Sequence, residues 1–208
     1  MLPGDLIMED WNGDGYIDGN DVYPVRINTA IDKGNKNGGM PLINFGLTFG
    51  AEYKNFDLSF VFQGVAMSWL IYPEQLSSPL PWNRNGLDMF LDRWHRSDEM
   101  DPNCTTWVPG HYPSTYADNG RSGFANPEST FNIENASYLR LKSLELGYTL
   151  PKHIIGKLGM ERTRIFFNGY DLLTFTGLKY CDPEHTGDDY AYIYPLSQIL
   201  NFGINITF

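Results

Sequence analysis

The chain contains long segments in which apolar and polar side chains alternate residue by residue. In residues 44–53 the odd positions are apolar or aromatic, and the even positions are polar or glycine. The alternation resumes at 56–63, after Lys54 and Asn55, and returns at 200–208. A period of two places one face of a β-strand in an apolar medium and the other against water or polar groups. The sequence therefore predicts an all-β chain of antiparallel strands.

The length of these segments and the position of their aromatic residues favour a lipid-facing sheet. Strands in soluble proteins average about 5 or 6 residues, whereas a tilted strand needs about 10 residues to cross a bilayer. Aromatic residues also gather at both strand ends, as they do in the two interfacial girdles of a membrane barrel. One group is Tyr53, Tyr148 and Phe208, and the other is Trp69, Tyr72 and Tyr194. A soluble β-sandwich also alternates and remains the alternative.

Composition excludes several classes of protein. The net charge is −10 and no cluster of Lys and Arg is present, so the electrostatic footprint of a nucleic-acid-binding protein is missing. No stretch approaches the roughly 18 consecutive apolar residues of a transmembrane helix. The first residues, MLPGDLIMEDW, lack the basic and apolar regions of a signal peptide. No catalytic motif or His-rich metal motif is recognisable, so we expect no enzyme.

Connections of alternating length organise the chain. A tight turn at 54–55 and a moderate connection at 150–161 contrast with long connections at about 70–135 and 175–193. Membrane barrels have short periplasmic turns and longer external loops. Counting strands back from Phe208 places the C-terminus and both shorter connections in the periplasm. It places the long loops and the polar residues 1–40 outside the cell. The barrel strands and their loops then occupy 41–208.

Two predicted strands are ambiguous. In residues 138–150, Leu144, Leu146 and Tyr148 face lipid, yet Arg140 and Lys142 share their parity. Either these charges lie among the outer headgroups, or a β-bulge near Lys142 switches the face. In residues 164–173 the consecutive apolar residues hide the parity, so the faces of this strand are not assigned.

The sharpest local motif is DWNGDGYIDGND at residues 10–21, which fits the ligand spacing of a calcium-binding loop. The predicted ligands are Asp10, Asn12, Asp14, Tyr16 through its backbone carbonyl, Asp18 and Asp21. Gly15 permits the sharp turn. Asp21 stands where a helical calcium-binding hand has Glu, and its shorter side chain reaches less easily for bidentate binding. A metal-free turn closed by Asx hydrogen bonds is the alternative.

Several segments of the chain are familiar. The longest is 135–151, NASYLRLKSLELGYTLP. Others are Gly4-Asp5, 10–18, 53–59 (YKNFDLS), 62–64 (FQG), 91–94 (LDRW), 180–184 (YCDPE), 194–196 (YPL) and the ending 201–208 (NFGINITF). Together they resemble the SusC/RagA family of TonB-linked outer-membrane proteins, and 135–151 resembles a signature near that family's C-terminus. The matches cover nearly the whole chain in the family's order. The chain is therefore expected to be the C-terminal part of such a protein.

The resemblance implies a barrel of about 22 strands, of which this chain supplies five or six, with long extracellular loops. It implies import of a glycan or peptide across the outer membrane of a Gram-negative, Bacteroidota-type cell. The expected partners are a SusD-like surface lipoprotein and TonB, which is engaged by an N-terminal part that this sequence lacks. Phe208, at the end of an alternating strand, resembles the signal recognised by the barrel-assembly machinery. Calcium is the only cofactor expected.

An interpretation from a different class of protein stays open. A secreted, calcium-stabilised β-sandwich that binds carbohydrate would show similar alternation and a similar loop. The two cysteines, Cys104 and Cys181, are far apart in sequence and form no metal-binding spacing. The sequence leaves open whether they are thiols or a disulfide.

Overall fold

A computed structural model describes residues 3–21, 41–72, 74–77, 85–114, 129–184, 194 and 196–208. The chain divides into two compact units. The loop unit comprises Met1–Ile27 and Ile71–Glu134, and the sheet unit comprises Asn28–Leu70 and Asn135–Phe208. Residues 3–21 and the described part of the long central connection, which are separate regions of the sequence, thus belong to one unit. Each unit is described by itself below.

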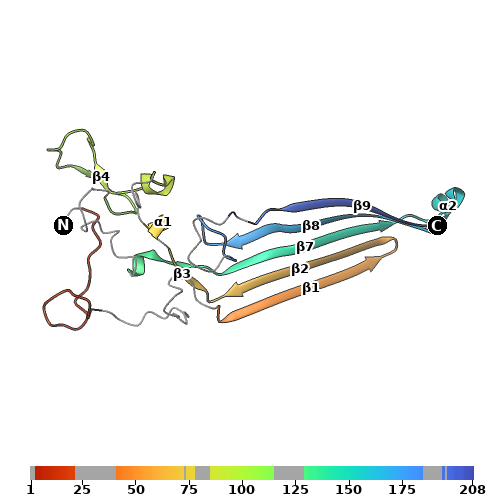
Figure 1. Ribbon diagram of the computed structural model, residues 1–208, viewed down its shortest axis with the longest axis horizontal. Coiled ribbons are helices and arrows are strands. Elements are labelled where there is room, and N and C mark those ends of the chain that lie inside the picture. Colours follow the sequence, from red (N-terminus) through yellow and green to blue (C-terminus); the bar gives the residue numbers. More distant parts are fainter. Residues whose placement is uncertain are drawn as a thin grey trace. The chain divides into compact units, whose positions relative to one another are not determined.

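The sheet unit is built on one antiparallel sheet of five long strands (Figure 1). The strands are β1 (Ile43–Tyr53), β2 (Phe56–Ala66), β7 (Tyr138–Thr149), β8 (Arg162–Thr176) and β9 (Ile199–Thr207). Their order in the sheet is β1-β2-β7-β8-β9, so each strand lies beside the next long strand in the chain. They contain between 9 and 15 residues, the length predicted from the alternation.

The register of the strands collects the apolar residues of all five strands on one face. Phe49 pairs with Phe60, and Phe60 pairs with Leu144. On the other side of the sheet's centre, Leu146 pairs with Phe167, which pairs with Phe202. The ring centroids of Phe49 and Phe60 lie 5.0 Å apart, and those of Phe167 and Phe202 lie 5.1 Å apart. Cross-strand aromatic pairs of this kind stabilise the register.

Two opposed irregularities move the charges of β7 off this apolar face. Residue pairing shifts between Leu141 and Ser143, so that Lys142 is an extra residue on β7. On β8, Asp171 and Leu172 lie opposite it, and Asp171 has a positive φ of 52°. A bulge inverts the alternation beyond it. Arg140 therefore shares the polar face with Gln63 and Thr174. Of the two explanations that the sequence allowed, the bulge is confirmed.

The same pairing assigns the faces of β8. Ile165 and Phe167 pair with apolar-face residues of β7, and so do Leu173 and Phe175 beyond the bulge. Arg164, Phe166 and Asn168 belong to the polar face. Periodicity alone hid this arrangement because Phe166 places an apolar ring on the polar face. There it lies over Gly203 of β9, where an added Cβ would come within 2.3 Å of the ring.

The short connections meet at one end of the sheet, as predicted (Figure 1). Lys54, with a φ of 55°, forms the tight turn between β1 and β2. Between β7 and β8 lie a helical turn, α2 (Lys152–Ile155), and a 3-10 turn, η4 (Gly156–Leu158). The C-terminus lies at this end too. Here Phe56 and Tyr148 bring their rings to a centroid distance of 4.6 Å. The second predicted aromatic group is divided, because Tyr72 belongs to the loop unit.

The loop unit consists of short elements around a small core. They are α1 (Glu74–Ser77), η2 (Asp88–Leu91), β4 (His95–Arg96), β5 (Trp107–Val108) and η3 (Thr130–Asn132). Met89 and Phe90 are buried, with Tyr112 packed against them. A further pair of strands, β3 (Trp69–Ile71) and β6 (Ile133–Asn135), forms a separate two-stranded sheet. The region predicted to be irregular thus has only short regular elements in its described part.

A β-sandwich requires a second sheet that covers the apolar face. Among the described residues the long sheet forms a single layer, and its apolar side chains are open to the surroundings. Phe202 is 82% exposed, Ile204 61% and Leu47 59%. The described residues therefore favour the barrel segment over the sandwich, because none of them in the sheet unit buries this face.

Gly147 offers a test of the packing on the polar face. A Cβ at this position would lie 2.4 Å from the Asp57 carboxylate and the Arg164 guanidinium, whose ion pair crosses over the glycine. We expect Gly147→Val to destabilise the protein by about 1–3 kcal/mol, the usual cost of overpacking. The measurement is the denaturant midpoint of unfolding. Gly50→Val, where no atom lies within 4 Å of the added Cβ, is the control. Equal midpoints for the two variants would contradict the prediction.

Candidate functional site

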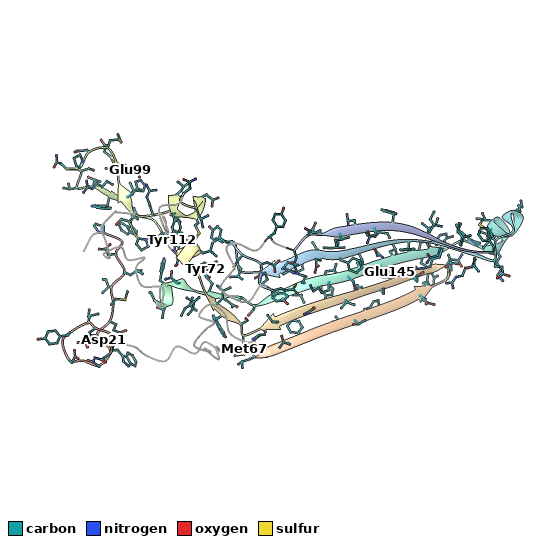
Figure 2. The ribbon with its side chains drawn as sticks, viewed as in Figure 1. Asp21, Met67, Tyr72, Glu99, Tyr112 and Glu145 are labelled. Atoms are coloured by element: carbon teal, nitrogen blue, oxygen red, sulfur yellow. The ribbon has the colours of Figure 1, made fainter. Side chains whose placement is uncertain are left out.

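The polar face of the sheet holds an ion cluster near the end with the short turns. Arg164 of β8 donates from Nε to Asp57 Oδ1 of β2 at 3.0 Å, and from Nη2 to Glu145 Oε1 of β7 at 2.6 Å. Its Nη2 also contacts Asp57 Oδ2. Figure 2 shows Glu145 on the sheet. One guanidinium therefore joins three neighbouring strands, and Gly147 leaves the space in which it does so.

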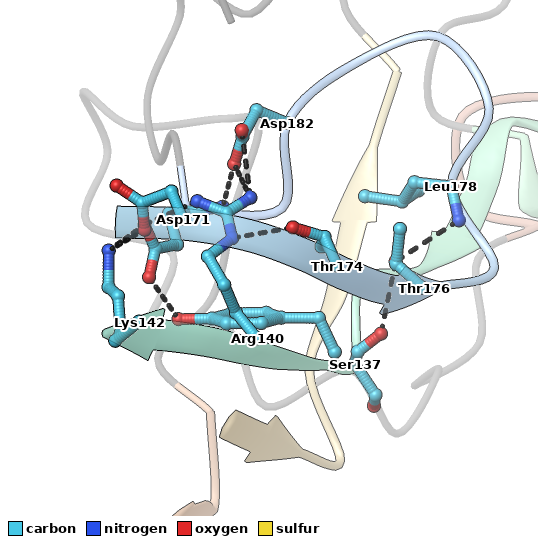
Figure 3. Close-up of polar contacts among 10 residues, drawn as sticks. Ser137, Arg140, Lys142, Asp171, Thr174, Thr176, Leu178 and Asp182 are labelled. Atoms are coloured by element: carbon cyan, nitrogen blue, oxygen red, sulfur yellow. Dashed lines mark hydrogen bonds and ion pairs between the residues drawn. The ribbon is translucent and has the colours of Figure 1, made fainter. Parts of the chain in front are cut away.

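A second, more buried cluster lies at the opposite end of β7 and β8 (Figure 3). Arg140, whose side chain is 3% exposed, donates from Nη2 to both carboxylate oxygens of Asp182 at 2.8 Å, and from Nη1 to Glu184 Oε2 at 2.7 Å. Lys142 donates to Asp171 at 2.9 Å and to Glu184 at 2.8 Å. We call these five residues the loop cluster, because Asp182 and Glu184 belong to the connection that follows β8. Each buried charge has a partner, as burial requires.

The loop cluster was not predicted from the sequence. Its signal was present in two separate features: charges with the wrong parity on β7, and an acidic run after β8. Arg140 and Lys142 looked misplaced because their counter-ions lie far along the chain, from 29 residues for Lys142 and Asp171 to 44 for Arg140 and Glu184. Pairing across such a distance depends on the β7–β8 register and on the bulge, neither of which periodicity determines.

The predicted calcium loop forms a closed turn in the loop unit. The Asp10 carboxylate accepts hydrogen bonds from the N–H groups of Gly13, at 2.7 Å, and of Gly15, at 2.9 Å. Asp21 closes the loop by accepting from the N–H groups of Trp11, at 2.9 Å, and of Asp18, at 2.7 Å. Figure 2 labels Asp21 in this loop. Gly13 and Gly15 have φ values of 76° and 87°, which glycine adopts without strain.

The remaining predicted ligands form Asx turns along the same loop. Asn12 accepts from the N–H of Asp14 at 2.8 Å, and Asp14 accepts from the N–H of Tyr16 at 2.8 Å. Asp18 accepts from the N–H of Asn20 at 2.8 Å. This is the hydrogen bonding of the metal-free alternative. All the predicted metal-ligand atoms are oxygens, which suits calcium rather than a softer metal.

The protonation state of Asp21 follows from these bonds. The hydrogen bond from the Asp18 N–H, with those from Asn12 and Trp11, holds the pKa of this exposed carboxyl below its ordinary value of 3.8. A lowered pKa means that loop closure by Asp21 is fully present above the ordinary value and is lost as the pH falls through the lowered one. The carboxylate is therefore ionised at neutral pH and available to a cation.

Other predicted groups are placed as follows. Among the described residues, no group of three His, Cys, Asp or Glu side chains is gathered in a way that could hold a metal ion. The oxygen chemistry and spacing of residues 10–21 fit calcium, although their carboxylates are turned towards backbone N–H groups.

Cys104 and Cys181 are thiols rather than a disulfide. Phe208 is 81% exposed. No helix within the described ranges is long and apolar enough to cross a membrane.

Comparisons with known proteins point in the same direction as the geometry. No family model matches the chain. TonB-dependent receptor P26 of Formosa agariphila is 27% identical over 222 residues, which cover 100% of this chain and 20% of the relative. TonB-dependent receptor P3 of the same organism is 27% identical over 81% of this chain and 16% of the relative. The chain thus spans about a fifth of the length of these curated relatives.

Solved structures give a matching result for the fold. The RagAB peptide importer in its closed-closed state aligns with 94% of this chain and 20% of its own, with a TM-score of 0.62 and 26% identity. The open-open state aligns with 81% of this chain and 17% of its own, with a TM-score of 0.55 and 28% identity. The sheet is therefore of the kind found in membrane β-barrel transporters. The resemblance to SusC/RagA-type TonB-dependent receptors, drawn above from the sequence, is confirmed.

Proposed function

We propose that this chain forms part of the wall of an outer-membrane β-barrel that imports nutrient oligomers with energy from TonB. The observation that supports this most directly is the five-stranded sheet with one uncharged apolar face and one polar, ion-paired face. The apolar face contacts the hydrocarbon of the membrane and the polar face lines or contacts the lumen. The cell is Gram-negative and of the Bacteroidota type.

Energetics support a lipid environment for the apolar face. Burying a large apolar side chain in an apolar medium is worth about 1.5–3 kcal/mol, and many such side chains are exposed together here. Water would therefore destabilise the sheet. The two edge strands, β1 and β9, also present backbone groups that a bilayer cannot satisfy. We infer that further strands pair with both edges and close the barrel.

The proposed partners follow from the same assignment. The names of the curated relatives, TonB-dependent receptors, support energy transfer by TonB. The RagAB structures support a SusD-like surface lipoprotein that works with the barrel. Phe208, exposed at the end of β9 with its apolar-face neighbours, is the proposed contact for the barrel-assembly machinery. We propose no nucleic-acid partner and no catalytic role.

Matched substitutions on the two faces of β9 test the membrane assignment. Phe202 lies on the apolar face and Asn201 on the polar face. A lysine facing lipid costs about 2–4 kcal/mol at the bilayer midplane, whereas a lumen-facing lysine is tolerated. We therefore expect Phe202→Lys to reduce the amount of folded protein in outer-membrane fractions and Asn201→Lys to leave it close to wild type. Equal amounts for the two variants would argue against a lipid-facing sheet and would reopen the interpretation as a secreted sandwich.

The import role needs a test of its own, which also separates the two nutrient classes. Cells that lack the gene are grown on defined peptides or defined glycans as the sole carbon source. We expect growth to be lost on one of these classes and restored by the intact gene, because an oligomer too large for a porin needs its own barrel. Peptides are the first class to try, because RagAB is a peptide importer. Unimpaired growth on both classes would contradict the proposal.

We also propose that residues 10–21 bind calcium and that the ion stiffens an extracellular loop. The ligands are the side-chain oxygens of Asp10, Asn12, Asp14, Asp18 and Asp21, with the backbone carbonyl of Tyr16. Support comes from the spacing of these oxygens and from the positive φ of Gly15, which allows the sharp turn. Calcium binding would replace some of the hydrogen bonds that these carboxylates now accept from the loop backbone.

Calorimetric titration with calcium tests this proposal. We expect binding by the wild-type protein and a loss of at least about tenfold in affinity for Asp14→Ala, because a carboxylate ligand contributes both charge and an oxygen to the ion. Asp88→Ala changes a carboxylate outside the loop, in η2, and is the control. Identical titrations of the wild type and Asp14→Ala would leave the loop as a turn closed by its own hydrogen bonds.

A further inference from the structure

We propose that residues 177–184 form a latch that the charge of Glu184 holds closed against the polar face of β7 and β8. Glu184 is the positioning residue of this latch, and Asp182 supports it. The proposal adds a regulatory element to the proposed import function, and it rests on that function in one respect. If the polar face lines the lumen, the closed latch narrows the passage at the end of the sheet away from the short turns.

Glu184 is the point at which most of the latch contacts converge. Its Oε1 accepts a hydrogen bond from the Tyr138 hydroxyl at 3.0 Å. Its Oε2 accepts from Arg140 Nη1 at 2.7 Å and from Lys142 Nζ at 2.8 Å. All three donors belong to the first part of β7 and project from its polar face. The Glu184 carboxylate thus accepts from three donors of β7, two of them cationic, and the Asp182 carboxylate adds a second contact with Arg140.

The bulge in β7 is what makes this convergence possible. Without it, Arg140 and Tyr138 would lie on the face opposite Ser143 and Glu145. The ion pair of Lys142 with Asp171 joins the two opposed irregularities of β7 and β8. The latch therefore closes onto a site that the sheet has formed around the bulge.

Bonds within the latch and at its base favour one closed geometry. The Asp182 carboxylate accepts from the Glu184 N–H at 2.9 Å, so the two acidic residues are held in a fixed relation. At the base, the Leu178 N–H donates to Thr176 Oγ1 at 3.2 Å, and that hydroxyl donates to the Ser137 carbonyl at 3.1 Å (Figure 3). Leu178 is 8% exposed. The base stays attached to the sheet while the acidic tip depends on charge.

Opening the latch separates Arg140 from both of its carboxylate partners. Arg140 would keep the hydrogen bond from Nε to Thr174 Oγ1, at 2.8 Å, but no counter-ion from the latch. Breaking a buried ion pair by removing one partner is strongly unfavourable, because the remaining charge is uncompensated. The closed state is therefore favoured while Glu184 is charged, and loss of that charge shifts the latch towards the open state.

The chain contains its own reporter for this opening. Cys181 lies inside the latch and is partly buried, and Cys104 lies in the loop unit. Both are thiols. Hydrogen bonding with Ser97 lowers the pKa of the Cys104 thiol, and Cys104, which lies outside the latch, serves as an internal reference. The ratio of the two labelling rates then measures how often the latch opens.

The experiment uses the protein at its natural length, purified in detergent and labelled with a small maleimide, with site-resolved mass spectrometry. Losing charge-assisted hydrogen bonds shifts an equilibrium by about tenfold or more. We expect Glu184→Gln to raise the rate at Cys181 relative to Cys104 by about that factor. Asp182→Asn, outside the strands, should raise it in the same direction. Glu52→Gln, an exposed carboxylate on the polar face of β1, is the matched control and should change neither rate.

An unchanged Cys181 rate in both Glu184→Gln and Asp182→Asn would overturn the latch. If Glu184→Gln does not fold, Asp182→Asn alone decides, because that variant keeps the Glu184 carboxylate with its bonds to Tyr138 and Lys142. An equal increase in Glu52→Gln would also overturn the proposal, since the effect would then be a general loosening. Labelling needs no nutrient and no TonB. The latch can therefore fail while import holds, and import can fail while the latch holds.

Discussion

The separation of charge from apolar surface across a single sheet is the constraint on which the rest of this structure depends. A strand has only two faces, and five strands in register share them. One charged side chain on the wrong face would place an ion against hydrocarbon. Register errors of one residue would do this for a whole strand. The aromatic pairs Phe49–Phe60, which is stacked, and Phe167–Phe202, which is tilted, hold the register on the apolar side, and ion pairs between strands hold it on the other.

The bulge at Lys142 shows how the chain keeps that separation where simple alternation fails. An extra residue on β7, opposed by two on β8, moves Arg140 to the polar face and leaves Leu139 and Leu141 on the apolar one. A bulge interrupts ladder hydrogen bonds and carries a cost. The same irregularity brings together the loop cluster, in which two cations meet three carboxylates. The bulge in β7 and the position of the loop after β8 therefore depend on each other.

The loop unit is stabilised by different interactions. Its described part has a small core at Met89 and Phe90, and much of its order comes from local hydrogen bonds. In residues 10–21, carboxylates bind backbone N–H groups within a few residues of themselves. Such a loop can be formed by short-range contacts alone, and the same oxygens suit a hard cation.

The sequence by itself determined the strand class, the approximate bounds of the long strands and the end of the sheet at which the short turns meet. These depend on periodicity and on turn residues, which are local properties. The resemblance of 135–151 and of the ending 201–208 to SusC/RagA proteins was also recognisable in the residues. Only the tertiary structure decided the faces of β8, the bulge at Lys142 and the pairing of Arg140 with Asp182 and Glu184. Each of these depends on which residues of distant strands lie opposite one another. A period of two does not show where one strand has an extra residue relative to its neighbour.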